Sequence, residues 1–224
     1  MKSLKIEVYK KLQKVKLKKE FSRLFEKYSE YTMIPQGLYF ANLNLAYHYR
    51  NVPGSIVECG VWKGGMIAGM TELIATKKAY LFDSYEGLPD AREIDGQDAL
   101  NWQKDVEGSY YFDNCMADEK FAIEAMQKSG CEFESSKGWF EETLIQTAHL
   151  EEISILRLDA DWYDSTLCCL RELYPKVARG GIIIIDDYYT WDGCSRAVHR
   201  YLNEIGSMSR VNSESGIAYI KKQD

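Results

Sequence analysis

Two stretches of the chain place paired carboxylates directly behind apolar runs. The run Ile153–Leu158 is followed by Asp159 and Asp161, and four consecutive isoleucines precede Asp186 and Asp187. Unbroken apolar runs rich in β-branched residues predict strands that are buried on both faces. Ligands of an open parallel sheet bind just beyond the carboxyl ends of its strands. If these two strands are neighbours, the four aspartates meet at one edge of the sheet.

Four carboxylates at one edge repel one another unless protons or a cation neutralise them. Oxygen-only ligands suit a hard divalent ion, so the pattern predicts an Mg²⁺ site. The alternative is that the aspartates cap the helices that follow, as Asp164 could do. A cap explains one aspartate at each turn, whereas each of these turns carries two.

A glycine-rich turn earlier in the chain predicts a second binding element. The predicted strand Ser55–Cys59 leads into the turn Gly60–Gly65 and then into a helix that runs to about Thr76. Gly60 lets the backbone approach a ligand closely, and a helix N-terminus favours a carboxylate or a phosphate. Asp83 ends the next predicted strand, where an acid commonly binds ribose hydroxyls. We interpret these features as a nucleoside-type site; the alternative is a structural turn followed by a helix cap.

The rest of the chain alternates predicted strands with predicted helices, which is typical of an α/β fold. Helices are expected over 4–28, after the breakers Pro35 and Gly37 as far as residue 49, and over 117–129, 141–147, 166–178 and 192–205. Further strands are expected over 79–82, 131–135, 208–212 and 216–220. We assign residues 1–50 to an N-terminal helical extension and residues 51–224 to one globular domain that closes in a β-hairpin. The irregular stretch 87–118 carries glycines and aromatic residues, which indicates a lid.

Composition restricts the class of partner. The chain has 224 residues and a net charge of −6, which argues against nucleic acid as the main partner. Residues 1–28 nevertheless hold ten Lys/Arg and three Glu, so the rest of the chain carries −13. A basic amphipathic helix there can bind a membrane surface or an acidic partner. We favour a helix packed on the domain or on a second subunit, and we expect a homo-oligomer, a dimer or higher.

Cysteine usage and hydropathy predict the compartment. None of the six cysteines forms a CxxC pair, which favours free thiols in a reducing compartment over disulfides or a zinc site. The first thirty residues contain no continuous apolar block, and no run reaches the length of a membrane span. We therefore expect a cytoplasmic protein.

Six motifs stand in a specific order between about residue 30 and residue 205. They are Tyr31–Met33, Val57–Gly65, Phe82–Pro89, Lys137–Leu144, Leu156–Thr166 and Leu173–Gly193. In sequence, order and spacing they resemble the metal-dependent sugar O-methyltransferases of macrolide and aminocoumarin antibiotic biosynthesis, the macrocin, mycinamicin and novobiocin type.

The resemblance implies a fold, a donor and a metal. The fold would be the Rossmann-like class I methyltransferase fold, a mostly parallel sheet of seven strands in which the last-inserted strand is antiparallel. The donor would be S-adenosylmethionine, the metal Mg²⁺, and the acceptor a sugar-containing small molecule. Carried over by motif position, the metal ligands would be Asp159, Asp186 and Asp187, and the general base would be Asp161. The donor-binding residues would be Glu58, Gly60, Gly64, Asp83 and Ser84, with Gly138 and Trp139 near the adenine.

The chain departs from the family pattern at three positions. Ala160 stands where the family usually has Gly, Tyr189 replaces a Gly after the paired aspartates, and His199 replaces an acid. We place Tyr189 at the entrance of the substrate site. The change at Tyr189 therefore bears on the identity of the acceptor and not on the type of reaction.

Other functions remain as alternatives. A catechol-type O-methyltransferase would need a weaker base, and such sites usually replace one paired aspartate by Asn, whereas both Asp186 and Asp187 are present. A non-catalytic subunit of the same fold would tolerate loss of the acidic positions, and every one is intact. An NAD-dependent enzyme is disfavoured because the glycine turn departs from GxGxxG spacing.

Overall fold

The computed structural model describes residues 2–75, 77–109, 111–150 and 152–223, with side chains from residue 11 onwards. Its centre is one sheet with the strand order β3-β2-β1-β4-β5-β7-β6. The strands are β1 (Ser55–Cys59), β2 (Ala79–Asp83), β3 (Phe133–Lys137), β4 (Ile153–Leu158), β5 (Val177–Ile185), β6 (Val211–Glu214) and β7 (Ile217–Lys221). The first five are parallel, and β7 is antiparallel to both of its neighbours. The predicted seven-stranded sheet is therefore confirmed.

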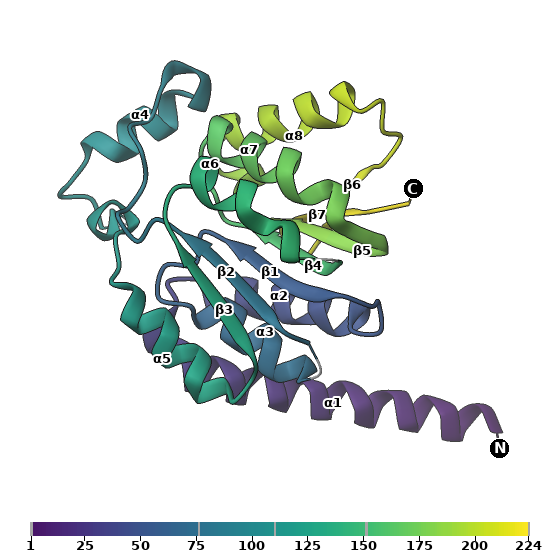
Figure 1. The fold of residues 1–224 in the computed structure, drawn as a ribbon. Helices are drawn as coiled ribbons and strands as arrows, with labels where there is room; N and C mark the ends of the chain where they lie inside the picture. Colours follow the sequence, from purple (N-terminus) through teal and green to yellow (C-terminus); the bar gives the residue numbers. More distant parts are fainter. Residues whose placement is uncertain (1, 76, 110, 151, 224) are drawn as a thin grey trace.

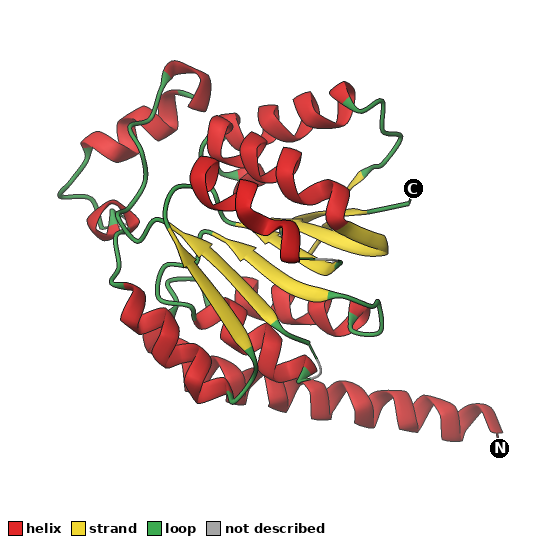
Figure 2. Ribbon diagram, in the orientation of Figure 1, coloured by secondary structure: helices red, strands yellow, loops and turns green. Residues whose placement is uncertain are grey.

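Helices cover both faces of this sheet (Figures 1 and 2). One face carries α1 (Lys2–Tyr28), α2 (Gln36–Tyr49), α3 (Gly65–Ile74) and α5 (Glu119–Ser129). The other carries α6 (Phe140–Thr143), α7 (Tyr163–Leu173) and α8 (Asp192–Glu204). Every residue of β4 is buried, because side chains of a central parallel strand meet helices on both faces. Among the described residues, no helix combines the length and apolarity needed to cross a membrane.

The helix α1 belongs to the core over its second half only. Phe21, Leu24 and Tyr28 are buried in the same core cluster as α2 and α3, whereas Leu12 and Val15 are exposed. The amino-terminal part of α1 extends beyond the body of the molecule (Figure 1). Phe21, Leu24 and Tyr28 therefore share a core with α2 and α3, although they lie within residues 1–50, which we interpret as an extension.

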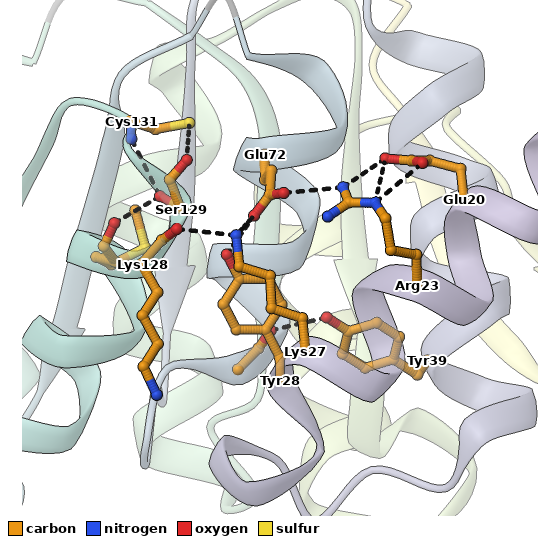
Figure 3. A network of polar contacts seen from close by, with 11 residues as sticks. Glu20, Arg23, Lys27, Tyr28, Tyr39, Glu72, Lys128, Ser129 and Cys131 are labelled. Carbon is orange, nitrogen blue, oxygen red and sulfur yellow. Dashed lines mark hydrogen bonds and ion pairs between the residues drawn. The ribbon is translucent and has the colours of Figure 1, made fainter.

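A carboxylate of α3 holds α1 against the domain (Figure 3). Glu72 accepts hydrogen bonds from Arg23 at 2.8 Å, from Lys27 at 2.6 Å and from the hydroxyl of Tyr28. The Glu72 side chain is 16% exposed, whereas Glu20, which pairs with Arg23 alone, is 41% exposed. Removing Glu72 therefore takes one acceptor from each of Arg23 and Lys27, which keep Glu20 and the carbonyl of Lys128, and takes the acceptor of the Tyr28 hydroxyl.

We expect Glu72→Ala to lower the free energy of unfolding by about 2 kcal/mol, the usual loss for charged hydrogen bonds that are partly buried. Glu20→Ala is the matched control, because an exposed ion pair contributes only about 0.2–1 kcal/mol. Urea denaturation of both variants measures the difference. Equal losses would show that α1 is not anchored through Glu72.

Several predicted boundaries differ from the structure. The helix predicted to reach Ala178 ends at Leu173, because Pro175 lacks the N–H that a continuing helix would use, and β5 starts at Val177. Predicted strand 131–135 lies two residues later, as β3. The stretch 87–118 is more regular than predicted, since it contains α4 (Gln97–Lys104) between two short 3₁₀ turns.

Candidate active site

Three of the predicted aspartates converge at the carboxyl edge of the sheet. The strands β4 and β5 are neighbours, so the turns that follow them meet. One carboxylate oxygen from each of Asp159, Asp161 and Asp187 lies within 4.8 Å of the others. The backbone N–H of Asp161 donates to Asp187 Oδ2 at 3.2 Å, which ties the two turns together. A small relaxation would bring the three oxygens to the spacing of ligands around one divalent ion.

The turn after β4 is not an extension of the strand. Asp161 has a φ of +52°, a left-handed conformation that is uncommon for residues other than glycine and that clusters at functional sites. The helix-cap alternative is wrong for both turns, because the N-cap residues of α7 and α8 are Trp162 and Trp191. Asp164 lies inside the first turn of α7, where it pairs with Arg92.

Asp186 lines the same cavity but is paired with a buried arginine. Its Oδ1 lies 2.6 Å from Nη2 of Arg157, which comes from β4. Nη1 of the same guanidinium donates to Asp159 Oδ2 at 2.8 Å and to Glu58 Oε1 at 2.8 Å. The metal set predicted from the family motifs groups Asp186 with Asp159 and Asp187, whereas this geometry groups Asp161 with them. Metal titrations of aspartate variants distinguish the two sets.

Glu58 presents a free oxygen to the cavity. The residue is 1% exposed, and its Oε2 is buried without a hydrogen-bond partner among the described residues. Burial raises the pKa of Glu58 to about 8, against the lowering effect of the Arg157 charge. A buried oxygen without a partner is costly, so this atom fits a cationic or hydrogen-bond-donating ligand group.

The glycine turn after β1 is held by Asp83. Asp83 Oδ2 accepts from the backbone N–H groups of Val61 at 2.6 Å and Trp62 at 2.8 Å, and its Oδ1 accepts from Tyr85 at 2.6 Å. A Cβ at Gly60 would lie 1.7 Å from the carbonyl oxygen of Asp159, so only glycine lets the turn approach the end of β4 this closely. Asp83 therefore shapes the turn, in addition to any contact it makes with a ribose.

The other residues assigned to donor binding lie around this turn. Gly64 is the N-cap of α3 with a φ of +81°, and a Cβ there would meet Ala122 of α5 at 2.8 Å. The hydroxyl of Ser84 donates to the carbonyl of Gly87 and accepts from a backbone N–H, so it orders the start of the predicted lid. Gly138 donates its N–H to the carbonyl of Asp83 at 2.9 Å, and this places Trp139 at the cavity wall.

A cavity of about 650 Å³ joins these groups, within the range of small-molecule sites. Of the predicted site residues, the cavity lining contains Glu58, Gly60, Asp83, Ser84, Trp139, Asp159, Asp161, Asp186 and Asp187, and lacks Gly64 and Gly138. Tyr189 is also absent from the lining and is 60% exposed, so its predicted place at the mouth is not supported by this geometry. The lining holds seven Asp/Glu against one Arg, so the cavity favours cationic ligands.

The stretch 87–118 covers one side of the cavity. Asp95 is 2% exposed, and its side chain accepts from the backbone N–H of Tyr163 at 2.7 Å, at the start of α7. Trp102 of α4 contacts Trp191 edge-on, with ring centroids 6.0 Å apart. Trp191 in turn donates its indole N–H to Asp161 Oδ1 at 3.0 Å. The covering segment thus reaches the acidic cluster through two tryptophans.

Burial and mutual repulsion perturb the carboxylates of the cluster. Burial is the largest cause that raises the pKa of Asp161, followed by the charge of Asp159. Burial and then the charge of Asp161 raise the pKa of Asp187. A bound cation would reverse the repulsive part of these shifts, because it stabilises the ionised forms.

Sequence patterns missed Arg157, Asp95 and Trp191. A signal existed for Arg157 alone, since it is a charged residue inside an otherwise apolar predicted strand. Asp95 and Trp191 act through contacts 68 and 30 residues along the chain, which no local pattern reveals.

The sheet order, with the cavity at the carboxyl ends of its parallel strands, defines a class I methyltransferase fold. The chain belongs to the macrocin O-methyltransferase (TylF) family, whose model matches residues 30–215. The solved O-methyltransferase NovP shares the fold with a TM-score of 0.71 and 26% identity, over 87% of this chain and 83% of that chain. The methyltransferase MycE, solved with Mg, SAH and mycinamycin VI, has a TM-score of 0.55 at 16% identity, over 91% of this chain and 54% of that chain, and shows the fold alone.

Two curated relatives carry specific names. The chain is 34% identical over 167 residues to the demethyldecarbamoylnovobiocin O-methyltransferase of Streptomyces niveus, covering 67% of this chain and 59% of the relative. It is 30% identical over 174 residues to the 8-demethyl-8-(2,3-dimethoxy-alpha-L-rhamnosyl)-tetracenomycin-C 4'-O-methyltransferase of Streptomyces olivaceus, covering 74% and 64%. The matches thus span less than two thirds of the length of either relative.

We expect Asp83→Ala to weaken binding of S-adenosylhomocysteine by about 1.5–3 kcal/mol, because charged hydrogen bonds around the donor turn are lost. Isothermal titration calorimetry measures this affinity. Glu86→Ala is the matched control, since Glu86 is an exposed acid three residues along the chain. Unchanged affinity in Asp83→Ala would remove Asp83 from the donor site.

Proposed function

We propose that this protein is an S-adenosylmethionine- and Mg²⁺-dependent O-methyltransferase that acts on a hydroxyl of a sugar-containing small molecule. One observation carries the proposal: the acidic cluster of Asp159, Asp161 and Asp187 and the unpartnered Oε2 of Glu58 line the same cavity. Family membership supports O-methylation, and the names of the two relatives support glycosylated natural products as acceptors.

The residues of the cavity fit S-adenosylmethionine and Mg²⁺. Glu58 Oε2 would accept from the ammonium of the donor, and the N-terminal turn of α3 would lie beside it, with Gly60 and Asp83 shaping the approach. Asp159 and Asp187 would hold the ion, with Asp161 or Asp186 close to it. A divalent ion in such a site supplies Lewis acidity, which lowers the pKa of an acceptor hydroxyl.

Asp161 is the residue that we assign to proton transfer. An ordinary carboxylate, with a pKa near 4, is far too weak a base to deprotonate a sugar alcohol alone. Asp161 would therefore accept the proton from a hydroxyl whose pKa the divalent ion has lowered. Trp191 holds Asp161 Oδ1, which leaves Oδ2 as the atom that accepts the proton. The tryptophans and the stretch 87–118 exclude water from this part of the cavity.

We also propose that the stretch 87–118 closes over donor and acceptor, and that the chain forms a homo-oligomer. The contacts of Asp95 and Trp102 with the opposite wall support a closing segment. Closure would exclude water and complete the acceptor pocket. The exposed Leu12 and Val15 on α1 support a second subunit as a partner of that helix.

A methyl-transfer assay tests the proposed function. The purified chain is incubated with S-adenosylmethionine, Mg²⁺ and a panel of glycosides that carry rhamnose and related deoxysugars, with catechol as a separate arm. Formation of S-adenosylhomocysteine with a glycoside supports the proposal. Turnover of catechol alone would make the protein a phenol methyltransferase, and donor binding without turnover of any acceptor would favour a non-catalytic role.

A further inference from the structure

Arg157 has no part in the proton transfer described above, and its placement is unusual. It is 1% exposed near the carboxyl end of β4, and it is the sole Lys or Arg among the described residues that line the cavity. A fully buried guanidinium carries a large desolvation penalty. The position therefore needs a reason beyond packing, because an apolar residue of similar volume would fill the same space.

The contacts of Arg157 connect the proposed donor site with the proposed metal site, whose residues lie far apart in the sequence. Arg157 is paired in the sheet with Glu58 of β1 on one side and with Ile184 of β5 on the other. Its Nη1 donates to Glu58 Oε1 and to Asp159 Oδ2, each at 2.8 Å, and its Nη2 lies 2.6 Å from Asp186. One guanidinium thus orients Glu58, which we assign to the donor site, and also Asp159 and Asp186, which follow β4 and β5.

The atoms that Arg157 leaves free point to ligands. By taking Oε1 of Glu58 it fixes the carboxylate with Oε2 unpartnered beside the cavity. Its Nη1 also donates to Oδ2 of Asp159, a residue of the acidic cluster, so the guanidinium orients that carboxylate beside Asp161 and Asp187. A planar fork with several fixed N–H groups can do this, whereas a lysine ammonium cannot reach three carboxylates in fixed directions.

We propose that Arg157 is a positioning residue shared by the donor site and the metal site, so that one side chain sets the affinity for both. The proposal rests on the proposed function, since it takes S-adenosylmethionine and Mg²⁺ as the two ligands. Arg157 touches neither ligand and acts through Glu58 on one side and through Asp159 and Asp186 on the other.

Isothermal titration calorimetry with S-adenosylhomocysteine and, separately, with MgCl₂ tests this role without any acceptor. Arg157→Met should weaken both affinities by roughly 10- to 100-fold, the usual effect of removing a residue that orients ligating groups. Arg157→Lys should recover only a small part of either loss. Glu58→Gln should weaken the nucleoside alone, and Asp187→Asn should weaken the metal alone, because each belongs to one subsite.

Controls separate positioning from general stability. Arg171→Met removes a guanidinium that pairs with Glu204 on the surface, and it should leave both affinities unchanged. If Arg157→Met does not fold, Asn42→Ala replaces it, because Asn42 accepts from Arg157 Nε at 3.3 Å and should lower both affinities more weakly. Circular dichroism and thermal unfolding identify the folded variants before titration.

The outcomes distinguish this inference from the proposed function. In one outcome the wild-type protein binds both probes, but a folded Arg157→Met or Asn42→Ala variant loses affinity for neither probe or for only one. This result would overturn the inference and leave the proposed function standing. Wild-type protein that binds neither probe would overturn both. Paired losses in a folded variant, with Arg171→Met unaffected, would establish the shared role.

Discussion

Chelation with EDTA should abolish methyl transfer by this protein, and excess Mg²⁺ should restore it. The expected effect is large because Asp159, Asp161 and Asp187 crowd their oxygens within 4.8 Å of one another, and an ion neutralises this repulsion. An acceptor alcohol would then regain its ordinary weak acidity when the ion is removed. Initial rates measured after gel filtration into metal-free buffer provide the test. Full activity in the chelator would contradict the metal site.

The two neighbouring aspartates of the second turn make a matched pair for this test. Asp187→Asn should lower the apparent Mg²⁺ affinity, so that a high Mg²⁺ concentration recovers part of the activity. The family motifs predict the same for Asp186→Asn, whereas the ion pair of Asp186 with Arg157 predicts a smaller effect on the metal. Magnesium titrations of the two variants decide whether Asp186 turns towards the ion in the loaded protein. Lower pH should weaken Mg²⁺ binding in each case, because protons compete for carboxylates whose pKa is raised.

The fold could be predicted because its signals are local. The isoleucine run of β5 and the apolar run of β4 each end at aspartates, and glycine turns follow β1 and β3. Alternation of strand and helix then restricts the topology to a few arrangements. The errors lie where two local signals compete, as at Pro175, where helical periodicity continues past a residue that ends the helix.

The candidate site could be predicted only as a set of residues. The four aspartates and Glu58 that the motifs single out line one cavity, but motif order does not reveal which of their oxygens are free. That depends on Arg157, which is 99 residues from Glu58 along the chain, and on Asn42, which is 115 residues from Arg157. The orientation of Asp161 likewise depends on a left-handed φ, which the apolar run before it does not reveal. Side-chain direction in such a site is a property of the packed fold.

Asp161→Asn should lower kcat by about 10²–10⁴-fold, or roughly 3–5 kcal/mol, the usual effect of removing a general base. The substitution keeps the shape of the side chain and removes its basicity. Affinity for the donor should stay near that of the wild type, because Asp161 is not among the residues that we assign to donor binding. The wild-type rate should fall as pH drops through the pKa of Asp161, which burial and the charge of Asp159 raise. At a saturating Mg²⁺ concentration the variant should show no inflection at this pKa, and its residual rate should rise steadily with pH because hydroxide can replace the base.

The decisive comparison is between metal affinities in Asp161→Asn and Asp159→Asn. If Asp161 is the base, its variant binds Mg²⁺ nearly as well as the wild type, whereas Asp159→Asn binds it weakly. The crowding of Asp161 against Asp159 and Asp187 makes the opposite result physically possible, and an equal loss of metal in both variants would identify Asp161 as a ligand. Trp191→Phe completes the test, because it removes the N–H that holds Asp161 Oδ1 and keeps an aromatic ring beside Trp162. If Asp161 is the base, Trp191→Phe should lower kcat and leave the Mg²⁺ affinity of the protein unchanged. If Asp161 is a metal ligand, Trp191→Phe should lower the Mg²⁺ affinity as well.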